Sequence, residues 1–439
     1  MLSSSIALIG RSNVGKSTLF NRLTRTRNAI VGETAGLTRD RHYGKAIHDN
    51  KSLIIIDTGG WEKSRAQSIE SAMVRQTRQA IAEADFVFFV VDARSGLVPG
   101  DEEIAKKLYK LGKKVKLVIN KGDGLDSNLV EGEFGRLGYE NPSIISAMHG
   151  DGIFELMDSI LDEVPAVALS DHDENKIKIA IVGKPNVGKS TLVNKLVGED
   201  RLVTRDEPGT TRDSIFVDFS NGSDDYLLID TAGIRRKARV TGAVEKFSVI
   251  KTLHSIDVSD VVVLMMDAAD DLSDQDAKIG GYIIESGRAL VIAINKWDKV
   301  EKRHRDNFKI TLSEKLKFLS FSKVSYISAL SGSGIPNLIK NVKQARRSST
   351  TKLSSSRLNR ALRDAVLKQS PPISGRYRPK LKFAHQGGVN PPRIIIYGNG
   401  LNKLSGSYRR FLENHFIDAF SLKGTPVRLI FRSSNNPYV

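Results

Sequence analysis

The chain has 439 residues, of which 40% are hydrophobic and 27% charged, enough for about three domains. Its longest apolar runs, 86–91 and 261–266, are far shorter than the roughly 18 residues that cross a bilayer, which argues against a membrane-spanning protein. The first ten residues lack the positive region of a signal peptide, and the absence of cysteine excludes disulfides and thiolate metal sites. These features predict a cytoplasmic protein that is not inserted in a membrane.

The net charge of +17 is unevenly distributed along the chain. Residues 350–439 contain sixteen Lys and Arg but only three acidic residues, Asp364, Glu413 and Asp418, so they carry thirteen of the excess positive charges. A segment this basic predicts a polyanionic partner, either nucleic acid or an acidic membrane surface.

In chain order, short apolar runs alternate with helical patterns. The predicted strands of the first third are 5–9, 42–48, 52–57, 86–92, 115–119 and 142–146. The predicted helices are 16–25, 69–83, 101–111 and 153–163. This alternation predicts an α/β domain with a doubly wound sheet and helices on both of its faces.

The same arrangement returns later in the chain, because whole phrases recur at a nearly constant spacing. GRSNVGKSTLFNRL at 10–23 matches GKPNVGKSTLVNKL at 183–196, and IIIDTGG at 54–60 matches LLIDTAG at 227–233. The spacing of 173 residues grows to 182 at ISAMHGDGI and ISALSGSGI, which indicates loop insertions between retained elements.

The repeat predicts two tandem domains, 1–164 and 176–349, joined by an acidic linker at 165–175. A basic Ser/Thr-rich stretch at 346–356 marks the second boundary. Residues 350–439 then predict a small α+β domain with helices at 357–369 and 407–420 and strands at 380–385, 393–397 and 426–431.

Each tandem domain has a phosphate-binding loop between its first strand and first helix. Gly10-x4-Gly15-Lys16-Ser17 and its second copy, beginning at Gly183, match the P-loop pattern in the required strand–loop–helix context. Glycines let backbone N–H groups surround a phosphate at a helix N-terminus, and the lysine reaches the β- and γ-phosphates.

A D-x-x-G motif follows the third strand of each copy. Asp57 and Asp230 end apolar strands, so their carboxylates lie at the sheet edge where such folds bind ligands, suitably placed for Mg²⁺. Gly60 and Gly233 can offer a backbone N–H to a γ-phosphate and lose it after hydrolysis, which is the behaviour of a switch.

The N-K-x-D motifs at 120–123 and 295–298 indicate which nucleotide base each site binds. The carboxylates of Asp123 and Asp298 can accept both the N1–H and the exocyclic amine of guanine, whereas adenine offers no such pair of donors. Ser146-Ala147 and Ser328-Ala329 can offer a backbone N–H to the O6 of guanine. Two complete sites for GTP or GDP are therefore predicted.

The predicted nucleotide contacts follow from these motifs. In the first domain they are Gly10, Arg11, Ser12, Asn13, Val14, Gly15, Lys16, Ser17, Asp57, Thr58, Gly59, Gly60, Asn120, Lys121, Asp123, Ser146 and Ala147. In the second domain they are Gly183, Lys184, Pro185, Asn186, Val187, Gly188, Lys189, Ser190, Asp230, Thr231, Ala232, Gly233, Asn295, Lys296, Asp298, Ser328 and Ala329.

A fifth motif, GLTRD at 36–40 and GTTRD at 209–213, places Thr38 and Thr211 in the first switch loops, where they can reach Mg²⁺ when GTP is bound. With five motifs present twice, the sequence resembles the Der (EngA) family of double GTPases over essentially its whole length. Phrases such as GGVNPPRIIIYGN at 387–399 extend the resemblance into the basic domain. The resemblance implies GTP hydrolysis coupled to assembly of the large ribosomal subunit, contact with rRNA through a KH-like C-terminal domain, and a monomer. No Gly-x-x-Gly, the usual KH clamp on nucleic acid, occurs in 350–439.

Many GTPases orient the attacking water with a Gln after D-x-x-G, but Trp61 and Ile234 stand there. The resemblance implies that an Asn of each P-loop, Asn13 and Asn186, helps hold K⁺ in place of an arginine finger. The residues predicted to act in hydrolysis are Asn13, Lys16, Thr38, Gly60, Asn186, Lys189, Thr211 and Gly233. Those predicted to bind Mg²⁺ are Ser17, Thr38, Asp57, Ser190, Thr211 and Asp230.

Three other functions share some of these features. A GTP-dependent RNA-modification factor has a similar P-loop region, but here no cysteine or flavin-type site accompanies it. A membrane-associated transporter GTPase would need an apolar span. A nucleotide-sensing scaffold with one weakly active domain remains open, since both motif sets are complete.

Overall fold

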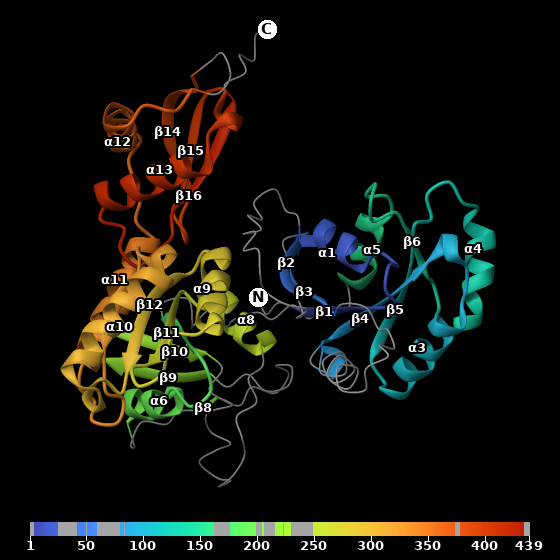
Figure 1. Cartoon of the computed structure of the whole chain (residues 1–439), viewed down its shortest axis with the longest axis horizontal. Helices are drawn as coiled ribbons and strands as arrows, with labels where there is room; N and C mark the ends of the chain where they lie inside the picture. The colour runs from blue at the N-terminus through green and yellow to red at the C-terminus, as the bar shows by residue number, and fades with distance from the viewer. Residues whose placement is uncertain are drawn as a thin grey trace. The chain divides into compact units, whose positions relative to one another are not determined.

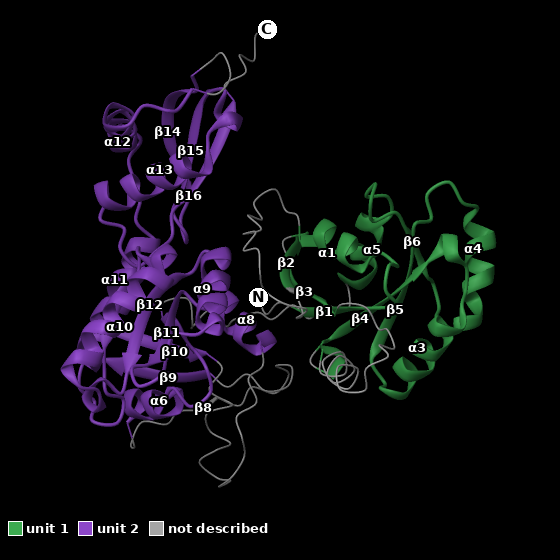
Figure 2. Ribbon diagram, viewed as in Figure 1, with its two compact units in different colours: residues 1–168 green, residues 169–439 purple. Residues whose placement is uncertain are grey.

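The computed structural model describes residues 4–24, 42–49, 51–58, 80–82, 84–161, 176–198, 204–205, 216–222, 224–229, 249–373 and 378–433. The chain forms two compact units, 1–168 and 169–439 (Figure 2). The predicted linker at 165–175 and most of the predicted helix 69–83 lie outside the described residues.

The first unit contains a six-stranded sheet with the order β2-β3-β1-β4-β5-β6 (Figure 1). Only β2 is antiparallel to its neighbour. The strands are β1 Ser4–Ile9, β2 His42–His48, β3 Lys51–Asp57, β4 Phe86–Asp92, β5 Lys114–Asn120 and β6 Ser143–Ile145. The described helices are α1 Lys16–Thr24, α3 Pro99–Lys110, α4 Ser127–Phe134 and α5 Ile153–Leu161. All six predicted strands are confirmed to within one residue at each end.

The second unit begins with a seven-stranded sheet of order β13-β12-β11-β7-β10-β9-β8, in which β8 and β9 run antiparallel to their neighbours. The strands are β7 Ile177–Val182, β8 Thr204–Arg205, β9 Phe216–Asn221, β10 Asp224–Ile229, β11 Val261–Asp267, β12 Ala289–Asn295 and β13 Lys323–Tyr326. The described helices are α6 Lys189–Val197, α8 Val249–Val258, α9 Asp274–Ser286, α10 Lys302–Lys315 and α11 Ile335–Ser349.

Burial explains why the central strands are continuous apolar runs. Every residue of β4, β11 and β12 is buried, because these strands lie in the parallel part of each sheet, where helices cover both faces. In the second unit the two faces form separate hydrophobic clusters. The predicted doubly wound α/β architecture is confirmed for both domains.

A small α+β domain completes the second unit. Its sheet has the order β14-β15-β16, with β14 antiparallel and β16 parallel to β15. The elements are α12 Ser355–Lys368, β14 Lys380–Gly388, β15 Arg393–Asn399, α13 Gly406–Ala419 and β16 Arg428–Ser433. Both helices pack on one face of the sheet, over the fully buried Ile394 and Ile396.

This domain is hydrogen-bonded to the second α/β domain near the beginning of β12. The Leu290 N–H donates to the Gly424 carbonyl, and the Gly424 N–H donates to the Phe321 carbonyl, both at 2.7 Å. Gly424 has a φ of +87°, and a Cβ there would lie 2.6 Å from the Cβ of Ala345, so only glycine suits this position. The P-loop lies beyond the opposite, carboxyl end of the parallel strands.

The predicted boundary at 346–356 is narrower in the structure. Helix α11 continues to Ser349, whose side chain is buried, and only 350–354 connect it to α12. Serine is a weak helix former, but tertiary burial overrides its propensity. Among the described residues, no helix combines the length and hydrophobicity needed to cross a membrane.

Helix α13 contains a carboxyl group with a shifted pKa. Burial raises the pKa of Glu413 to about 7, although Arg410 and Arg409 act in the opposite direction. A pKa raised by folding favours the protonated form, so the stability it contributes is complete below the ordinary value of 4.5 and is lost as pH rises through about 7.

We expect Glu413→Gln, which mimics the protonated form, to stabilise the C-terminal domain by about 1–2 kcal/mol at pH 8, with little effect at pH 5. Urea unfolding at both pH values measures this difference. Asp418→Asn, at an exposed position on the same helix, is the control. The same gain at both pH values would show that the charge of Glu413 is not responsible.

Candidate nucleotide-binding sites

Both P-loops have a backbone that only glycine fits at the residue before the lysine. Gly15 has a φ of +96° and Gly188 a φ of +98°. A Cβ at Gly15 would lie 2.2 Å from Nδ2 of Asn120, and one at Gly188 would lie 2.3 Å from Nδ2 of Asn295. The loop can therefore follow a phosphate closely while resting against the first residue of N-K-x-D.

The P-loop lysines turn back over their own loops. Nζ of Lys16 donates to the carbonyls of Gly10 and Arg11 at 3.0 and 2.5 Å. Nζ of Lys189 donates to the two equivalent carbonyls of its loop at 3.0 and 2.7 Å. Each ammonium group thus lies at the loop that wraps the β-phosphate in this motif.

Two predicted Mg²⁺ ligands of the first domain are in contact. The Ser17 hydroxyl donates to Oδ2 of Asp57 at 2.7 Å. A hydroxyl and a carboxylate are the hard oxygen ligands that Mg²⁺ takes in phosphate sites, so this pair fits the ion. Ser190 is the equivalent hydroxyl of the second domain.

Asn120 and Asn295 each join the base-binding loop to the P-loop. Nδ2 of Asn120 donates to the Val14 carbonyl at 2.8 Å, and its Oδ1 accepts from the Ala147 N–H at 2.9 Å. Asn295 makes both equivalent contacts, each at 2.8 Å. Both asparagines are buried, so replacing one would leave two polar groups of the protein without a partner.

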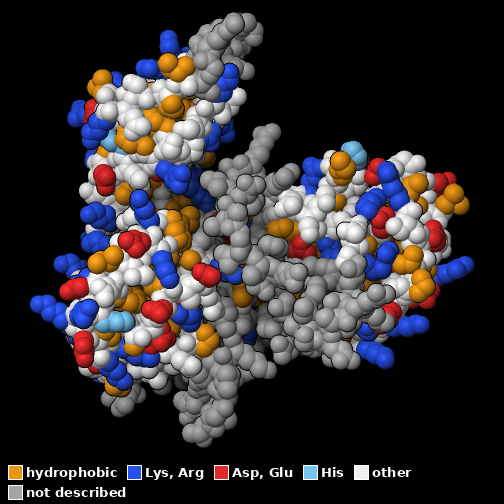
Figure 3. All heavy atoms as spheres, viewed as in Figure 1, with side chains coloured by type: hydrophobic (Ala, Val, Ile, Leu, Met, Phe, Trp, Pro, Cys, Tyr) orange, Lys and Arg blue, Asp and Glu red, His pale blue; other side chains and the backbone are white. Residues whose placement is uncertain are grey.

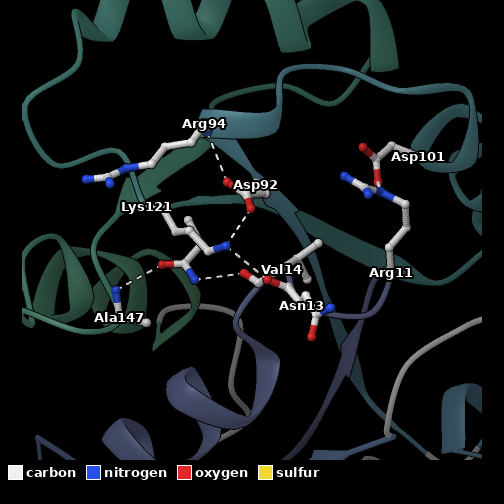
Figure 4. Close-up of polar contacts among 9 residues, drawn as sticks. Arg11, Asn13, Val14, Asp92, Arg94, Asp101, Lys121 and Ala147 are labelled. Carbon is white, nitrogen blue, oxygen red and sulfur yellow. Dashed lines mark hydrogen bonds and ion pairs between the residues drawn. The ribbon is translucent and has the colours of Figure 1, made fainter.

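The two lysines of N-K-x-D occupy the left-handed region, which non-glycine residues rarely adopt: φ is +63° at Lys121 and +59° at Lys296. Nζ of Lys121 donates to Oδ2 of Asp92 at 2.5 Å, and Lys296 pairs with Asp267 in the same way. Each aspartate is the buried last residue of its strand, β4 or β11. In the first domain Lys121 also donates to the Asn13 carbonyl at 3.0 Å, so its stem lies beside the P-loop, where a base can lie against it (Figure 4).

The sequence interpretation did not include Asp92 and Asp267. The signal was present, because the two lie 175 residues apart, the same spacing as the two N-K-x-D motifs, and both end apolar strands. Burial raises the pKa of Asp92, but the hydrogen bond and charge of Lys121 and the Arg94 N–H lower it by more. The pKa is therefore below its ordinary value, and the pair stays charged.

The predicted base reader of the first domain, Asp123, is an ionised acceptor. A hydrogen bond from the Ser146 hydroxyl and the positive charge of Arg94 lower the pKa of Asp123. Arg94 also forms an ion pair with it, with 2.6 Å between the guanidinium and Oδ2. The residue that corresponds to Arg94 in the second domain is Ala269, so the two base sites are not equivalent.

Because guanine needs the same carboxylate oxygens, we expect Arg94→Ala to raise the affinity of the first domain for GDP. Arg94 is 60% exposed, and exposed pairs contribute about 0.2–1 kcal/mol, so the gain should not exceed about fivefold. Titration with a fluorescent GDP measures it. The reciprocal change, Ala269→Arg, should weaken the second site by a similar factor; no effect of either change would show that the pair does not compete with the base.

The backbone N–H groups of the last motif already have acceptors within the protein. The Ser146 N–H donates to the Asp151 carbonyl at 3.0 Å, and that of Ala147 donates to Asn120. Ser328 and Ala329 repeat both contacts in the second domain. The expected donation to guanine O6 therefore stays a prediction.

A second pair missed from the sequence holds the other side of each P-loop. Nε of Arg11 lies 2.8 Å from Oδ1 of Asp101 in the first turn of α3, and Lys184 lies 3.1 Å from Asp276 in the first turn of α9. Asp101 is fully buried. Figure 4 shows the loop between this pair and the Asp92–Lys121 pair.

The remaining predicted site residues lie outside the described part of the chain. They are Thr38, Gly59, Gly60, Thr211, Asp230, Thr231, Ala232 and Gly233, together with Trp61 and Ile234. The Thr58 hydroxyl is described and donates to the Leu8 carbonyl at 2.8 Å.

Two family models match the chain, and the first matches each nucleotide-binding domain from its P-loop into N-K-x-D. The model of the 50S ribosome-binding GTPase family matches residues 5–121 and again 178–296. The model of the KH-domain-like C-terminal region of EngA bacterial GTPases matches residues 352–432.

Whole proteins also align along the chain. The GTPase Der of Burkholderia lata is 52% identical over 437 residues, which is 99% of this chain and 98% of that protein. The GTPases Der of Burkholderia vietnamiensis and Paraburkholderia phytofirmans match equally well. Among solved structures, Era in complex with MgGDPNP and a 16S ribosomal RNA segment is 21% identical, covering 70% of this chain and 98% of that one, with a TM-score of 0.34.

Proposed function

The chain belongs to the Der family of GTPases, and we propose that its GTP cycle controls attachment of the basic C-terminal domain to RNA of the large ribosomal subunit or its precursor. As a member of this family it binds GTP and GDP with Mg²⁺ and hydrolyses GTP. The proposal places it in the cytoplasm as a monomer. The observation that carries the proposal is the concentration of positive charge in a domain bonded directly to a nucleotide-binding domain.

The described site residues divide the work of hydrolysis among them. Lys16 and Lys189 place positive charge at the phosphate loop, and Ser17 and Asp57 supply oxygens for Mg²⁺. An Mg²⁺ ion held by these oxygens would neutralise charge that develops on the phosphates. Asp123 and Asp298 select guanine, so the sites combine base choice with phosphoryl chemistry.

The basic domain supplies the surface for RNA. It carries thirteen of the seventeen excess positive charges, and Lys and Arg side chains are prominent on its visible face (Figure 3). Phosphate-rich RNA is a natural counterion for such a surface, and binding releases condensed cations. Without a Gly-x-x-Gly clamp, contacts to the RNA backbone and its shape should dominate over sequence.

The hydrogen bonds of Gly424 support the link between the GTP cycle and this surface, because one of them joins the domain to Leu290 of β12, whose other end leads into N-K-x-D. The RNA-modification factor and the nucleotide-sensing scaffold, two of the three other functions, would use other features. An RNA-modification factor would need a second catalytic centre, and a scaffold would leave one P-loop without hydrolysis.

We expect truncation after Thr350, the residue that follows α11, to leave GTP hydrolysis largely intact while weakening co-sedimentation with the large subunit. A variant that keeps the fold, Arg363→Gln with Lys368→Gln on exposed positions of α12, should weaken binding and make it less sensitive to salt. The log–log slope should fall by about 0.7 for each phosphate of single-stranded RNA that the variant no longer neutralises.

The matched control removes two exposed lysines, Lys106 and Lys110, from α3 of the first domain. It should sediment like the unmodified chain. If the truncated chain sediments as well as the full chain across a salt series, the anchor lies in the nucleotide-binding domains and the proposal is wrong.

A further inference from the structure

Two helices cover one face of the C-terminal sheet, and among the described residues no helix covers the other face. The fully buried Ile394 and Ile396 define the covered face, where Leu429 and Phe431 also pack against the core. Side chains alternate along a strand, so the residues between them lie on the opposite, open face.

The strand register arranges the open face into three rows across β14, β15 and β16. The rows are Phe383–Tyr397–Arg432, His385–Ile395–Ile430 and Gly388–Arg393–Arg428. No acidic residue occupies any of these nine positions. The face therefore combines aromatic and aliphatic side chains with a cationic border.

The aromatic rings of the open face are stacked in parallel. The ring centroids of Phe383 and Tyr397 lie 4.6 Å apart at an interplanar angle of 9°, and those of His385 and Tyr397 lie 5.5 Å apart at 22°. The side chain of Phe383 is 45% exposed although β14 belongs to a packed domain. Exposed aromatic rings on a sheet are the side chains on which unpaired bases stack in several RNA-binding folds.

The arginines beside the rings distinguish this face from one that carries only a stabilising aromatic pair. Such a pair by itself stabilises a sheet. Here Arg432 pairs with Tyr397 in the register, and Arg393 lies on the same strand as Tyr397. A nucleotide whose base stacks on the rings would therefore have its phosphate near these cations. Arg428 contacts the Glu285 carbonyl of the preceding domain, which marks the end of the face nearest that domain.

We propose that the open face of β14, β15 and β16 binds single-stranded RNA, with Phe383 and Tyr397 stacking on unpaired bases and Arg432 contacting the adjacent phosphate. This rests on the proposed function and specifies how the basic domain holds RNA without a Gly-x-x-Gly loop. Because stacking tolerates every base, the site should show little sequence preference.

The test compares fluorescein-labelled RNA 8-mers that carry bases with abasic 8-mers of the same phosphate count, bound to the full chain. Phe383→Leu and Tyr397→Leu, which keep an apolar side chain but remove the ring, should each weaken binding of A- or U-rich 8-mers by about tenfold. Binding of the abasic 8-mer should not change. Tyr397→Phe, which keeps the ring, should retain the affinity.

Arg432→Gln should instead weaken both kinds of 8-mer and reduce the salt slope by about 0.7. The matched control is Phe318→Leu, a similarly exposed ring (44%) on the preceding domain, which should change neither binding. Far-UV circular dichroism and the GTPase rate verify that each variant is folded.

Unchanged binding of the base-bearing 8-mer by both leucine variants would overturn the stacking site, as would an equal loss for the abasic 8-mer. If RNA binding is unchanged but the hydroxyl-radical footprint of residues 1–168 changes, the face docks protein instead. The proposed function has its own test. It requires the charge variant on α12 to co-sediment less with the large subunit, whatever the result for the leucine variants.

Discussion

In the full chain, Asp298→Asn should convert the second site from guanine to xanthine nucleotides, so that one GTP and one XTP bind per molecule. The carboxylate accepts two hydrogens from guanine, whereas an amide presents a donor where guanine has a donor and xanthine an acceptor. Sites that read hydrogen bonds reject mismatched analogues by about 10⁴–10⁵, so the affinity of this site for GTP should fall at least about 10²-fold. Stoichiometry with labelled GTP and XTP measures the switch.

Asp123→Asn should produce the same switch in the first site, with one difference. The amide cannot pair with Arg94 as a carboxylate does, so the guanidinium loses its partner. The control for this domain is Asp126→Asn, three residues along, where the side chain caps α4 by accepting from the Asn128 N–H and an amide can do the same. If the Asp123→Asn variant and the Asp298→Asn variant each still bind two GTP molecules, these aspartates do not recognise the base.

The strands and the motifs were predictable because their signals are local. Continuous apolar runs such as β4 and β11 allow no polar face, and each P-loop follows its strand directly. Helix α4 was missed because it is eight residues long and buries only Val130 and Phe134, which is too little periodicity to recognise.

Contacts across strands were not predictable, because they depend on register. Asp92 meets Lys121 since β4 and β5 pair with Asp92 opposite Asn120, and β11 and β12 repeat this with Asp267 opposite Asn295. The open face of the C-terminal sheet depends on register as well, with an irregularity in β14 before Phe383. A one-residue slip would turn these rings into the core.

The presence of asparagine at positions 13 and 186 of the P-loops has two physical explanations. Asn13 and Asn186 have φ values of +64° and +65°, a region that asparagine tolerates better than most residues. Both are exposed, and among the described residues neither amide side chain has a hydrogen-bond partner. The asparagines are therefore explained in one of two ways: their side-chain oxygens bind a cation, or the residues are there only because asparagine tolerates this backbone conformation.

We propose that K⁺ held at these asparagines supplies the charge that an arginine finger supplies elsewhere, since Trp61 and Ile234 replace the water-orienting Gln. GTP hydrolysis should be faster in K⁺ than in Na⁺ at constant ionic strength. A single group that stabilises the transition state contributes about 10²–10³ in rate, so at least a tenfold difference is expected.

Asn186→Gly separates the two explanations, because glycine adopts a φ of +65° without strain but has no amide. If the side chain holds K⁺, this variant should lose much of the response of the second site while the Na⁺ rate stays near that of the unmodified chain. Asn186→Ala should lose the response and also weaken nucleotide binding, because alanine is strained there. Single-turnover rates in the Asp123→Asn background, with GTP as substrate, isolate the second site. Equal rates in K⁺ and Na⁺ for the unmodified chain, or a full K⁺ response in Asn186→Gly, would show that the catalytic charge comes from another source.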